Sequence, residues 1–425
     1  MQPPGKREVP VFDLVDHLFR HEAGRLVAAL VRIFGVHNLE LAEDVVQETF
    51  CRVLEVWKYR GVPDNPSAWL MRAARNRAID VIRRERTFRR FAPDLSLLLE
   101  SNWTLALTVD EYLVEHRIPD DQLRMMFSCC HPEIAVQAQV CLILKTLCGF
   151  SSREIAQALL AKPTAIEKRL YRAKQVLKAE GGLYEVSDEA QIAARADAVH
   201  QAIYLIFNEG YHGSHPQETI REELCQEALR LGALLTGHRV VAAESQALVA
   251  LMCFHLARLT ARVDGEGRLV PLEEQDRSRW ERPLIEQGVR FLERSAQGER
   301  VSAYHLEAGI AALHCLAASH DETDWTEIIA LYDLLYGLTP TPIVALNRAI
   351  AIGQAEGPGK ALEELNRIPG ALKLKDYPFY PAALGEFHRR AGHREEARDY
   401  FAQALRLARS PSESRFLERK LEVCG

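Results

Sequence analysis

The residues best suited to a specific chemistry form an arginine-rich stretch, WLMRAARNRAIDVIRRERTFRR, at residues 69–90. From Arg72 onward it holds eight arginines against two acids, Asp80 and Glu85. At helical spacing its apolar residues form one stripe, and the opposite face carries Arg72, Arg75, Asn76, Arg83 and Arg86. Guanidinium groups held in this way can donate forked hydrogen bonds to phosphates. The stretch therefore predicts a phosphate-binding helix, with a merely solvated arginine-rich face as the alternative.

A second stretch, SSREIAQALLAKPTAIEKRLYRAKQVL at residues 151–177, has the pattern of a helix-turn-helix motif. We expect Ser151 or Ser152 to cap a short helix, a turn at residues 161–163, and Thr164 to cap a second helix. In such motifs the start of the second helix enters the major groove of DNA. That helix is expected to bury Ile166, Leu170, Ala173 and Leu177. Its exposed candidates for DNA contact are Thr164, Glu167, Lys168, Arg169, Tyr171, Arg172 and Lys174.

The charge distribution agrees with DNA contact in the first part of the chain. Residues 1–90 hold 16 Lys and Arg against 12 Asp and Glu, whereas residues 91–151 are acidic. Residues 1–189 are neutral in sum, so the net charge of −6 falls on residues 190–425. A basic front and an acidic back half indicate DNA contact joined to a separate function.

The elements that position these residues are predicted to be helices throughout, which gives an all-α fold. We expect helices over residues 12–33, over 38–57 with Asn38 as its cap, and from Asn65-Pro66 to about Arg89. A linker at 91–118, four short helices to about residue 179 and a hinge at 181–189 follow. The predicted domains are therefore residues 10–90, 119–180 and 190–425.

The last domain is expected to consist of packed helix pairs. Residues 380–405 have the spacing of a tetratricopeptide unit, with Gly392 in the turn. Residues 345–365 match it when Ala345 is set on Ala383 and Ala361 on Ala397, offsets close to the roughly 34-residue repeat. A generic α-helical domain remains the alternative.

Several classes of protein are disfavoured by the sequence. There is no run of about 18 apolar residues for a membrane span and no signal-peptide pattern, so we expect a cytoplasmic protein without membrane contact. The nine cysteines lack a C-x-x-C pair and are expected to be reduced and buried. Neither Glu209, His212 and His215 nor the Cys129–His131 run has standard zinc spacing. No catalytic motif occurs, so we expect no enzyme activity, no metal and no cofactor.

Three motifs in order resemble one protein family. They are AEDVVQETF at residues 42–50, WLMRAARNRAIDVIRR at 69–84 and the EIAQALLAKPTAIEKRLYRAKQVL run at 154–177. Together they closely resemble RNA polymerase sigma factors of the extracytoplasmic-function class, the first two matching sigma region two and the third region four. The resemblance covers residues 10–180. It implies that core RNA polymerase and promoter DNA are the partners.

The resemblance also implies roles for particular residues. Core polymerase is expected to dock on Asp44, Gln47 and Glu48, whose carboxylates arginines can bind. The minus-ten element is expected to be captured, as unstacked single strand, by the turn at 59–65 and its flanks: Lys58, Arg60, Arg72, Arg75, Asn76, Arg83 and Arg84. The minus-thirty-five element is assigned to Thr164, Glu167, Lys168, Arg169 and Arg172. Trp57 and Trp69 are interpreted as core residues.

The remaining 235 or so residues resemble the subgroup of this class that has a long tetratricopeptide-like extension. The resemblance implies that the extension regulates the sigma part. An intramolecular contact between the two is one way in which it can do so. The main rival is a helix-turn-helix regulator with a repeat-type sensor domain. Such a regulator has no use for both the 42–50 and the 69–84 motifs. A third interpretation is a scaffold protein that acts through its repeats. It leaves the arginine-rich helix and the helix-turn-helix without a function.

Overall fold

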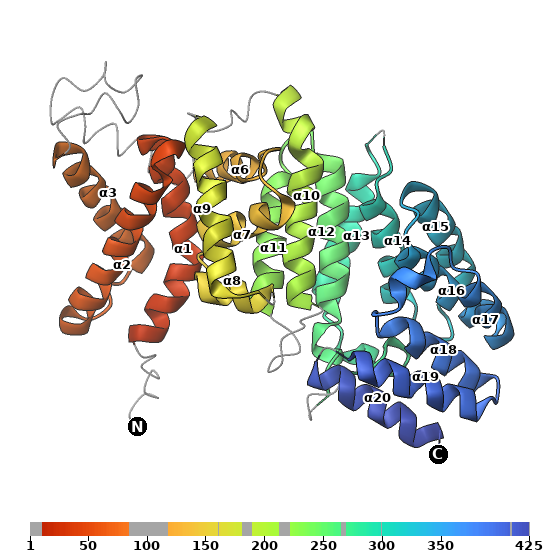
Figure 1. Ribbon diagram of the computed structural model, residues 1–425. Helices are drawn as coiled ribbons and strands as arrows, with labels where there is room; N and C mark the ends of the chain where they lie inside the picture. Colours follow the sequence, from red (N-terminus) through yellow and green to blue (C-terminus); the bar gives the residue numbers. More distant parts are fainter. Residues whose placement is uncertain are drawn as a thin grey trace, which may run out of the picture. The chain divides into compact units, whose positions relative to one another are not determined.

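The computed structural model describes residues 11–84, 118–159, 161–180, 189–211, 222–264, 269–298, 300–408 and 410–424. Within these ranges the elements are helices (Figure 1), and the one extended pairing is an isolated bridge between Val263 and Leu269. The predicted all-α fold is therefore confirmed. The chain divides into two compact units, Met1–Leu205 and Ile206–Gly425. The predicted linker at 91–118 and the hinge at 181–189 lie almost wholly outside the described residues.

The first unit begins with three mutually packed helices, α1 (Val11–Phe34), α2 (Leu39–Arg60) and α3 (Pro66–Arg84). Their positions agree with the predicted helices, although α2 continues one turn beyond the expected end. Asn38 is the N-cap residue of α2, as predicted, but its side chain makes no hydrogen bond to that helix. Its Nδ2 instead donates to the carbonyl oxygen of Phe34, 2.8 Å away. The side chain of Asn38 is thus directed toward a free carbonyl at the end of α1, and its oxygen accepts no hydrogen bond from α2.

Between residues 118 and 180 the described part of the chain forms four further helices, as the sequence predicted. They are α6 (Ile118–Cys129), α7 (Val136–Thr146), α8 (Ser152–Ala158) and α9 (Pro163–Glu180). Their shared core includes Phe127, Ile143, Ile155 and Ile166, all with no exposed surface. Burial of such side chains contributes about 1.5–3 kcal/mol each.

The two groups of helices in the first unit pack directly on one another. A Cβ atom at Gly24 of α1 would lie 2.0 Å from the carbonyl oxygen of Leu147, just after α7. Nearby, Arg32 of α1 donates to the fully buried carboxylate of Asp121 on α6, at 2.9 Å. The same carboxylate accepts from Arg124 at 3.1 Å. Close backbone approach and a buried ion pair therefore hold α1 against α6 and α7.

Helix α10 (Glu189–Tyr211) contains the boundary between the two units. Its first part packs within the N-terminal unit, where Arg195 is 5% exposed and donates to the carbonyl oxygen of Phe127 at 3.0 Å. His200 is 1% exposed on the same helix. Burial lowers the pKa of His200 to about 4, against a weaker opposing effect of Asp197.

Acid is expected to destabilise the first unit through His200. Because the unfolded histidine takes up a proton near pH 6.5 and the folded one near pH 4, the unfolded state binds more protons between these values. This contribution to stability is complete above pH 6.5 and falls by up to roughly 3 kcal/mol on acidification to pH 4. Urea unfolding at a series of pH values should show that His200→Leu has a shallower decline than the unchanged protein. His393→Leu, at an exposed histidine, should keep the full decline; equal slopes for the protein and His200→Leu would contradict the assignment.

The second unit is a succession of helices in which each contacts the next. They are α11 (Glu222–Leu235), α12 (Ala242–Ala257), α13 (Arg282–Ser295), α14 (Ala303–Leu316), α15 (Trp325–Leu338), α16 (Pro342–Glu356), α17 (Pro358–Asn366), α18 (Phe379–Arg390), α19 (Arg394–Leu407) and α20 (Pro411–Cys424). Helix α12 is almost wholly buried and contacts α11, α13 and α14. Between α12 and α13 lie the short turns η4 (Leu259–Ala261), η5 (Leu272–Glu274) and η6 (Arg277–Arg279), and η7 (Ala371–Leu374) precedes α18.

Small residues allow the last helices to approach closely, as the sequence indicated. Gly392 has a φ of 85° in the turn between α18 and α19. Ala361 and Ala397 have no exposed surface. A Cβ at Gly353 would lie 2.4 Å from the ring of Phe387. The tetratricopeptide repeat itself stays a prediction, since the helix pairs also suit a generic α-helical domain.

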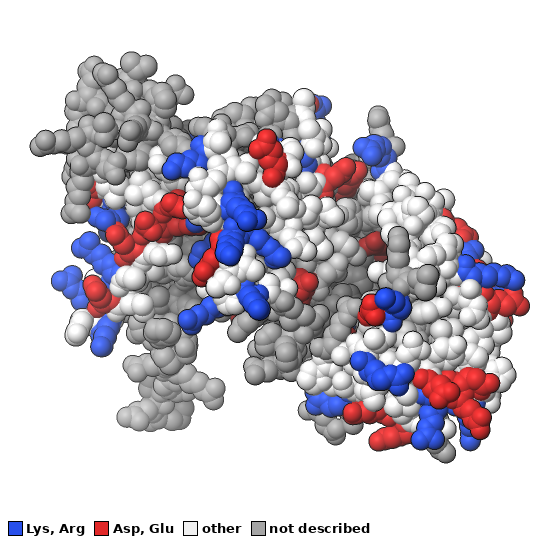
Figure 2. Space-filling model, viewed as in Figure 1, with Lys and Arg blue, Asp and Glu red and all other residues white. Residues whose placement is uncertain are grey.

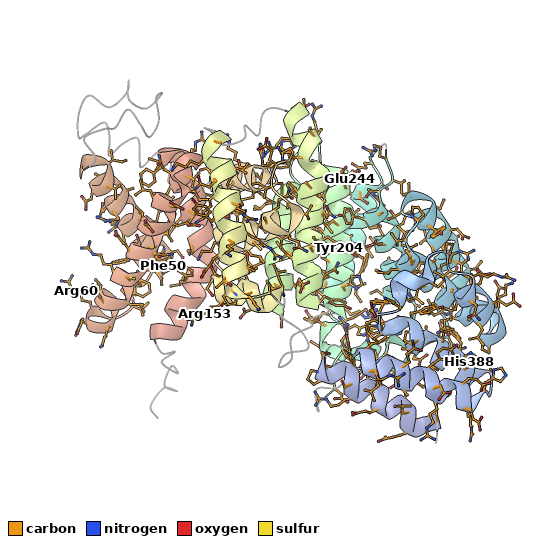
Figure 3. All side chains as sticks on the ribbon, in the orientation of Figure 1. Phe50, Arg60, Arg153, Tyr204, Glu244 and His388 are labelled. Atoms are coloured by element: carbon orange, nitrogen blue, oxygen red, sulfur yellow. The ribbon has the colours of Figure 1, made fainter. Side chains whose placement is uncertain are left out.

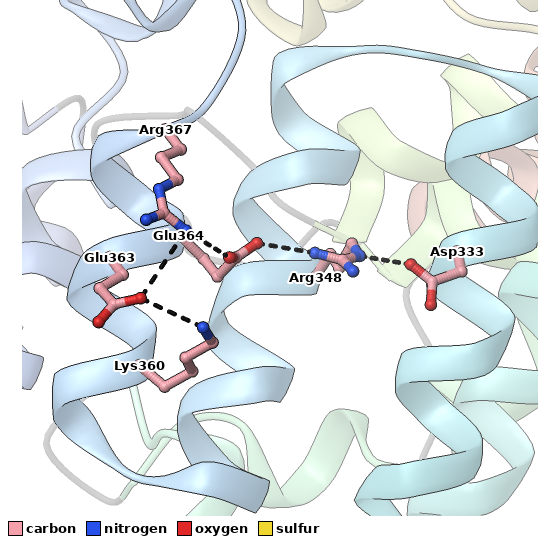
Figure 4. A network of polar contacts seen from close by, with 6 residues as sticks. All are labelled: Asp333, Arg348, Lys360, Glu363, Glu364 and Arg367. Carbon is pink, nitrogen blue, oxygen red and sulfur yellow. Dashed lines mark hydrogen bonds and ion pairs between the residues drawn. The ribbon is translucent and has the colours of Figure 1, made fainter.

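Polar side chains add a second connection between these helices. Arg348 of α16 donates to Asp333 of α15 at 2.5 Å and to Glu364 of α17 at 2.9 Å (Figure 4). One guanidinium thus joins three consecutive helices. Lys360, Glu363 and Arg367 extend the network along α17. These partly exposed pairs contribute less to stability than the buried residues beneath them.

Candidate functional site

The predicted polymerase-docking residues share a groove on α2. Asp44, Gln47 and Glu48 are all exposed, and the groove is also lined by Cys51, Arg52, Glu55 and Val56. The spacing of three and four residues places them on one side of the helix, opposite its buried residues such as Val45 and Val46. Three carboxylates against one arginine give the groove an acidic character suited to basic side chains of a partner.

Glu48 also has a partner within the chain. Its Oε2 accepts from Nε of Arg77 on α3, and the two side chains are 53% and 28% exposed. Arg77 was not among the predicted site residues, because the pair joins positions 29 residues apart. The contact joins α3 to the groove, while Asp44 and Gln47 remain exposed beside Glu48.

The end of α2 presents a basic and aromatic tip. Lys58, Tyr59 and Arg60 are exposed, Tyr59 to 83%, and Arg60 points away from the ribbon in Figure 3. Gly61 follows with a φ of 78°, which ends the helix and starts the turn. An exposed ring beside two cations is the combination that stacks on an unpaired base and holds its phosphates.

The predicted cap of α3 is confirmed. Oδ1 of Asn65 accepts from the backbone NH of Ala68 at 3.0 Å, and Pro66 is the first residue of the helix. On α3, Arg72 and Asn76 are exposed and Arg75 is half-buried, with its Nη1 donating to Oδ1 of Asn76 at 3.2 Å. Arg83 and Arg84 belong to the last turn of α3, but their side chains lie outside the described residues.

Trp57 and Trp69 join α2 to α3. Trp57 is 1% exposed, and its ring meets that of the half-buried Trp69 edge to face, with 5.7 Å between centroids. The interpretation of Trp57 as a core residue is confirmed. Together the two rings fix the angle at which the α2 tip and the arginines of α3 are presented.

The helix-turn-helix begins with a reciprocal cap. The hydroxyl of Ser151 accepts from the backbone NH of Glu154, and Glu154 accepts in return from the NH of Ser151 at 2.7 Å. In contrast, the prediction that Thr164 caps α9 is wrong, because the helix already starts at Pro163. The carbonyl of Lys162 accepts the first helical bonds, and Pro163 suits the first position because its ring presets φ.

The predicted division of α9 into buried and exposed faces is confirmed. Its buried residues are Ile166, Leu170, Ala173 and Leu177, each at most 6% exposed. Thr164, Glu167, Lys168, Tyr171 and Arg172 are exposed. Lys and Arg side chains gather over α8 and α9 on the face drawn in Figure 2.

Two basic residues of α9 are less available than the sequence indicated. Arg169 is half-buried, and its positive charge acts on the thiol of Cys141 on α7, against the burial that raises the pKa of that thiol. Lys174 forms a 2.6 Å ion pair with Glu43 of α2. Both contacts come from packing in the first unit, which helical periodicity alone does not reveal.

The cysteines and histidines of the described part do not form a metal site. No group of three potential ligands occurs there, and His212 and His215 lie outside it. Eight cysteines are buried free thiols, as expected, but Cys51 is exposed in the α2 groove. No helix in the described ranges is long and apolar enough to cross a bilayer.

The α2 groove with its basic tip and the capped helix-turn-helix both lie in the first unit. In comparison with known proteins, residues 18–88 match sigma-70 region 2, residues 124–177 match sigma-70 region 4, and residues 195–296 match a family of unknown function. An uncharacterized protein of Rhizobium meliloti (strain 1021) is 37% identical over 398 residues, covering 93% of this chain and 92% of that protein. The extracytoplasmic-function RNA polymerase sigma factor SigX of Bacillus subtilis (strain 168) is 24% identical over 169 residues, 39% of this chain and 84% of SigX. The chain belongs to the sigma factors of the extracytoplasmic-function class and carries a long helical C-terminal extension.

Proposed function

We propose that this sigma factor binds core RNA polymerase through the α2 groove and directs initiation at specific promoters. Asp44, Gln47 and Glu48 dock on basic residues of the polymerase. The α2 tip and the α3 arginines hold the opened minus-ten strand, and the exposed face of α9 reads the minus-thirty-five element. Bound DNA and polymerase are therefore the partners, and the factor itself carries out no chemistry.

The observation that carries this proposal is the combination found on α2. One helix holds an exposed acidic groove and, at its end, the exposed Lys58-Tyr59-Arg60 tip. Acidic side chains repel DNA, so the groove favours a protein partner, while the tip suits a nucleic acid. A protein that binds another protein at the groove and a nucleic acid at the tip is suited to bind RNA polymerase and promoter DNA at the same time.

The test is transcription in vitro with purified bacterial core polymerase on a promoter library, with and without the protein. Transcripts that start at defined sites only when the protein is added would support the proposal. A protein that binds duplex DNA without forming a complex with core polymerase would instead favour the helix-turn-helix regulator. A variant with both Lys168→Ala and Arg172→Ala should give less transcription but bind core polymerase as before, because both residues are exposed on α9.

We also propose that the C-terminal extension, residues 190–425, regulates the sigma part through α10. The support is the buried contact in which Arg195 donates to the carbonyl oxygen of Phe127. Phe127 has no exposed surface and belongs to the core of the region that matches sigma region 4. A helix that leads into the extension is therefore part of the packing around the helix-turn-helix.

Arg195→Ala is expected to change the promoter-dependent transcription rate at least about threefold, because removing a buried charged donor costs about 1.5–3 kcal/mol and loosens α10 from α6. Arg290→Ala, at an exposed position of α13, is the matched control and should have no effect. Circular dichroism establishes that both variants fold. Transcription by Arg195→Ala at the unchanged rate, in a folded protein, would refute regulation through this contact.

A further inference from the structure

The C-terminal unit contains a cavity that the sigma function does not use. It has a volume of about 370 Å³ and is lined by residues 271–273, by His320, and by α14, α15, α16, α18, α19 and α20. Cavities of roughly 300–1,000 Å³ with mostly apolar walls are typical of sites for small organic molecules. The Trp, Tyr and Phe side chains of the wall are Trp325, Tyr332, Phe379, Phe387, Phe401 and Phe416.

These rings extend from the floor of the cavity to its mouth. Phe387 of α18 and Phe401 of α19 are 2% and 1% exposed, so they form the floor. Phe379, at the start of α18, is 41% exposed and lies at the mouth. Water in contact with such a surface is less stable than water in bulk solution. Aromatic rings of a ligand can replace it, because they pack edge to face or offset against the rings of the wall.

One face of α16 contributes the uncharged polar groups of the wall. Its lining residues, spaced three and four apart, are Asn347, Ile350, Ala351 and Gln354. Two carboxamides therefore flank an apolar stretch. Asn347 is exposed, and Gln354 accepts from Arg390 at 2.8 Å through Oε1, which leaves its Nε2 without an acceptor in the described part of the chain. A carboxamide donates and accepts hydrogen bonds without carrying a charge.

The charged side chains of the wall are either paired or solvated. Glu386 accepts from Lys420 at 3.1 Å and from Arg389 at 2.6 Å. Glu273 has no ion pair among the described residues, but it is exposed to water at the rim. His314 is neutral near pH 7, because burial above all lowers its pKa to about 3. A charged ligand would therefore lose its hydration without meeting a free opposite charge inside the cavity.

We propose that this cavity binds a small aromatic molecule that carries no charge. The rings of the molecule lie among those of the wall and displace water from them. Its uncharged polar atoms form hydrogen bonds with the carboxamides of α16. The site gives the C-terminal extension a ligand of its own, and it stands whether or not the extension regulates transcription.

The probe is N-phenyl-1-naphthylamine, an uncharged aromatic compound whose fluorescence rises in apolar surroundings, titrated into the full-length protein. We expect one saturable site per chain. The anionic counterpart, 1-anilinonaphthalene-8-sulfonate, has the same rings and should bind at least about tenfold more weakly, because its charge has no partner in the cavity. For the opposite charge, (1-naphthylmethyl)trimethylammonium is compared with its uncharged isostere, 1-neopentylnaphthalene, in displacing the probe. The isostere should be the stronger competitor.

Two substitutions in the wall locate the site, each with a matched control. Asn347→Trp, at an exposed position, should fill part of the cavity and weaken probe binding at least about tenfold, as a blocked pocket requires. Asn366→Trp, exposed on α17 and not part of the wall, should bind normally. Phe379→Ala removes one aromatic contact and should weaken binding about threefold or more. Leu338→Ala, at an exposed apolar residue outside the wall, should have no effect.

Each outcome bears on the proposal, and circular dichroism establishes that the variants fold. Weaker binding by a folded wall variant, with both controls unchanged, would support the site. Unaltered binding by both wall variants would place the probe elsewhere and overturn it. Equal or tighter binding of the sulfonate, or of the ammonium compound relative to its isostere, would overturn the uncharged class. Absence of a saturable site in the unchanged protein would overturn the proposal as a whole.

Discussion

Replacing Asp44 and Glu48 together by arginine is expected to abolish promoter-dependent transcription. Both carboxylates are exposed in the α2 groove, and neither is needed for the core beneath it. Reversal of a charge at an interface replaces attraction by repulsion and costs several kcal/mol when the partner is basic. Two reversals at about 2 kcal/mol each correspond to a loss of affinity for core polymerase of roughly 1,000-fold. Affinity is measured by fluorescence anisotropy with labelled protein, and activity by run-off transcription.

The ion pair between Glu48 and Arg77 requires a second variant. Glu48→Arg removes this pair and places a cation beside Arg77. The double variant therefore weakens the contact between α2 and α3 in addition to changing the charge of the groove. Asp44→Arg alone leaves that pair intact and should still weaken polymerase binding about tenfold or more, the equivalent of one reversed charge.

Glu133→Arg carries the same change in charge at an exposed site between α6 and α7, outside the groove. It should behave as the unchanged protein. Wild-type affinity of Asp44→Arg for core polymerase would mean that the α2 groove is not the docking surface.

Features set by neighbouring residues were predictable from the sequence. The buried face of α9 follows from the 3.6-residue period, and the caps at Ser151 and Asn65 follow from residue type and position. Even so, the local rule failed at Thr164, because α9 begins one residue earlier at Pro163. At Asn38 it gave the cap position but not the side-chain bond, which is made to Phe34. The rule describes which residues can cap a helix, and the structure decides which one does.

Features that depend on distant residues were not predictable. Arg77 pairs with Glu48 across 29 positions, and Lys174 pairs with Glu43 across 131. Arg169 was assigned to DNA from its helical phase, yet it is half-buried against α7. The second unit also contains a pocket whose lining residues come from six helices and from two segments between helices, so no single motif indicated it. A single sequence contains no direct signal for such pairings, because periodicity reports which face is buried and not what covers it.

The contact between α1 and α7 is the clearest case of a feature hidden from sequence reasoning. A glycine inside a helix normally costs up to 1 kcal/mol relative to alanine, and Gly24 lies well inside α1. Here the missing Cβ allows the backbone of Leu147 to approach, since a Cβ would lie 2.0 Å from its oxygen and 2.5 Å from its carbonyl carbon. Side chains can move aside, but a backbone carbonyl held by its neighbours cannot move so far without displacing the helix.

Gly24→Leu is therefore expected to lower the free energy of unfolding of the first unit by at least about 3 kcal/mol, the upper range of overpacking. Urea unfolding monitored by circular dichroism measures the loss. Gly337→Ala in α15, where a Cβ would meet no atom within 4 Å, is the contrasting control and should be neutral or slightly stabilising. An unchanged unfolding midpoint for Gly24→Leu would show that α1 and α7 do not pack in solution as the structure has them. A loss of stability would instead show that the parts matching sigma regions two and four stabilise one another in the free protein.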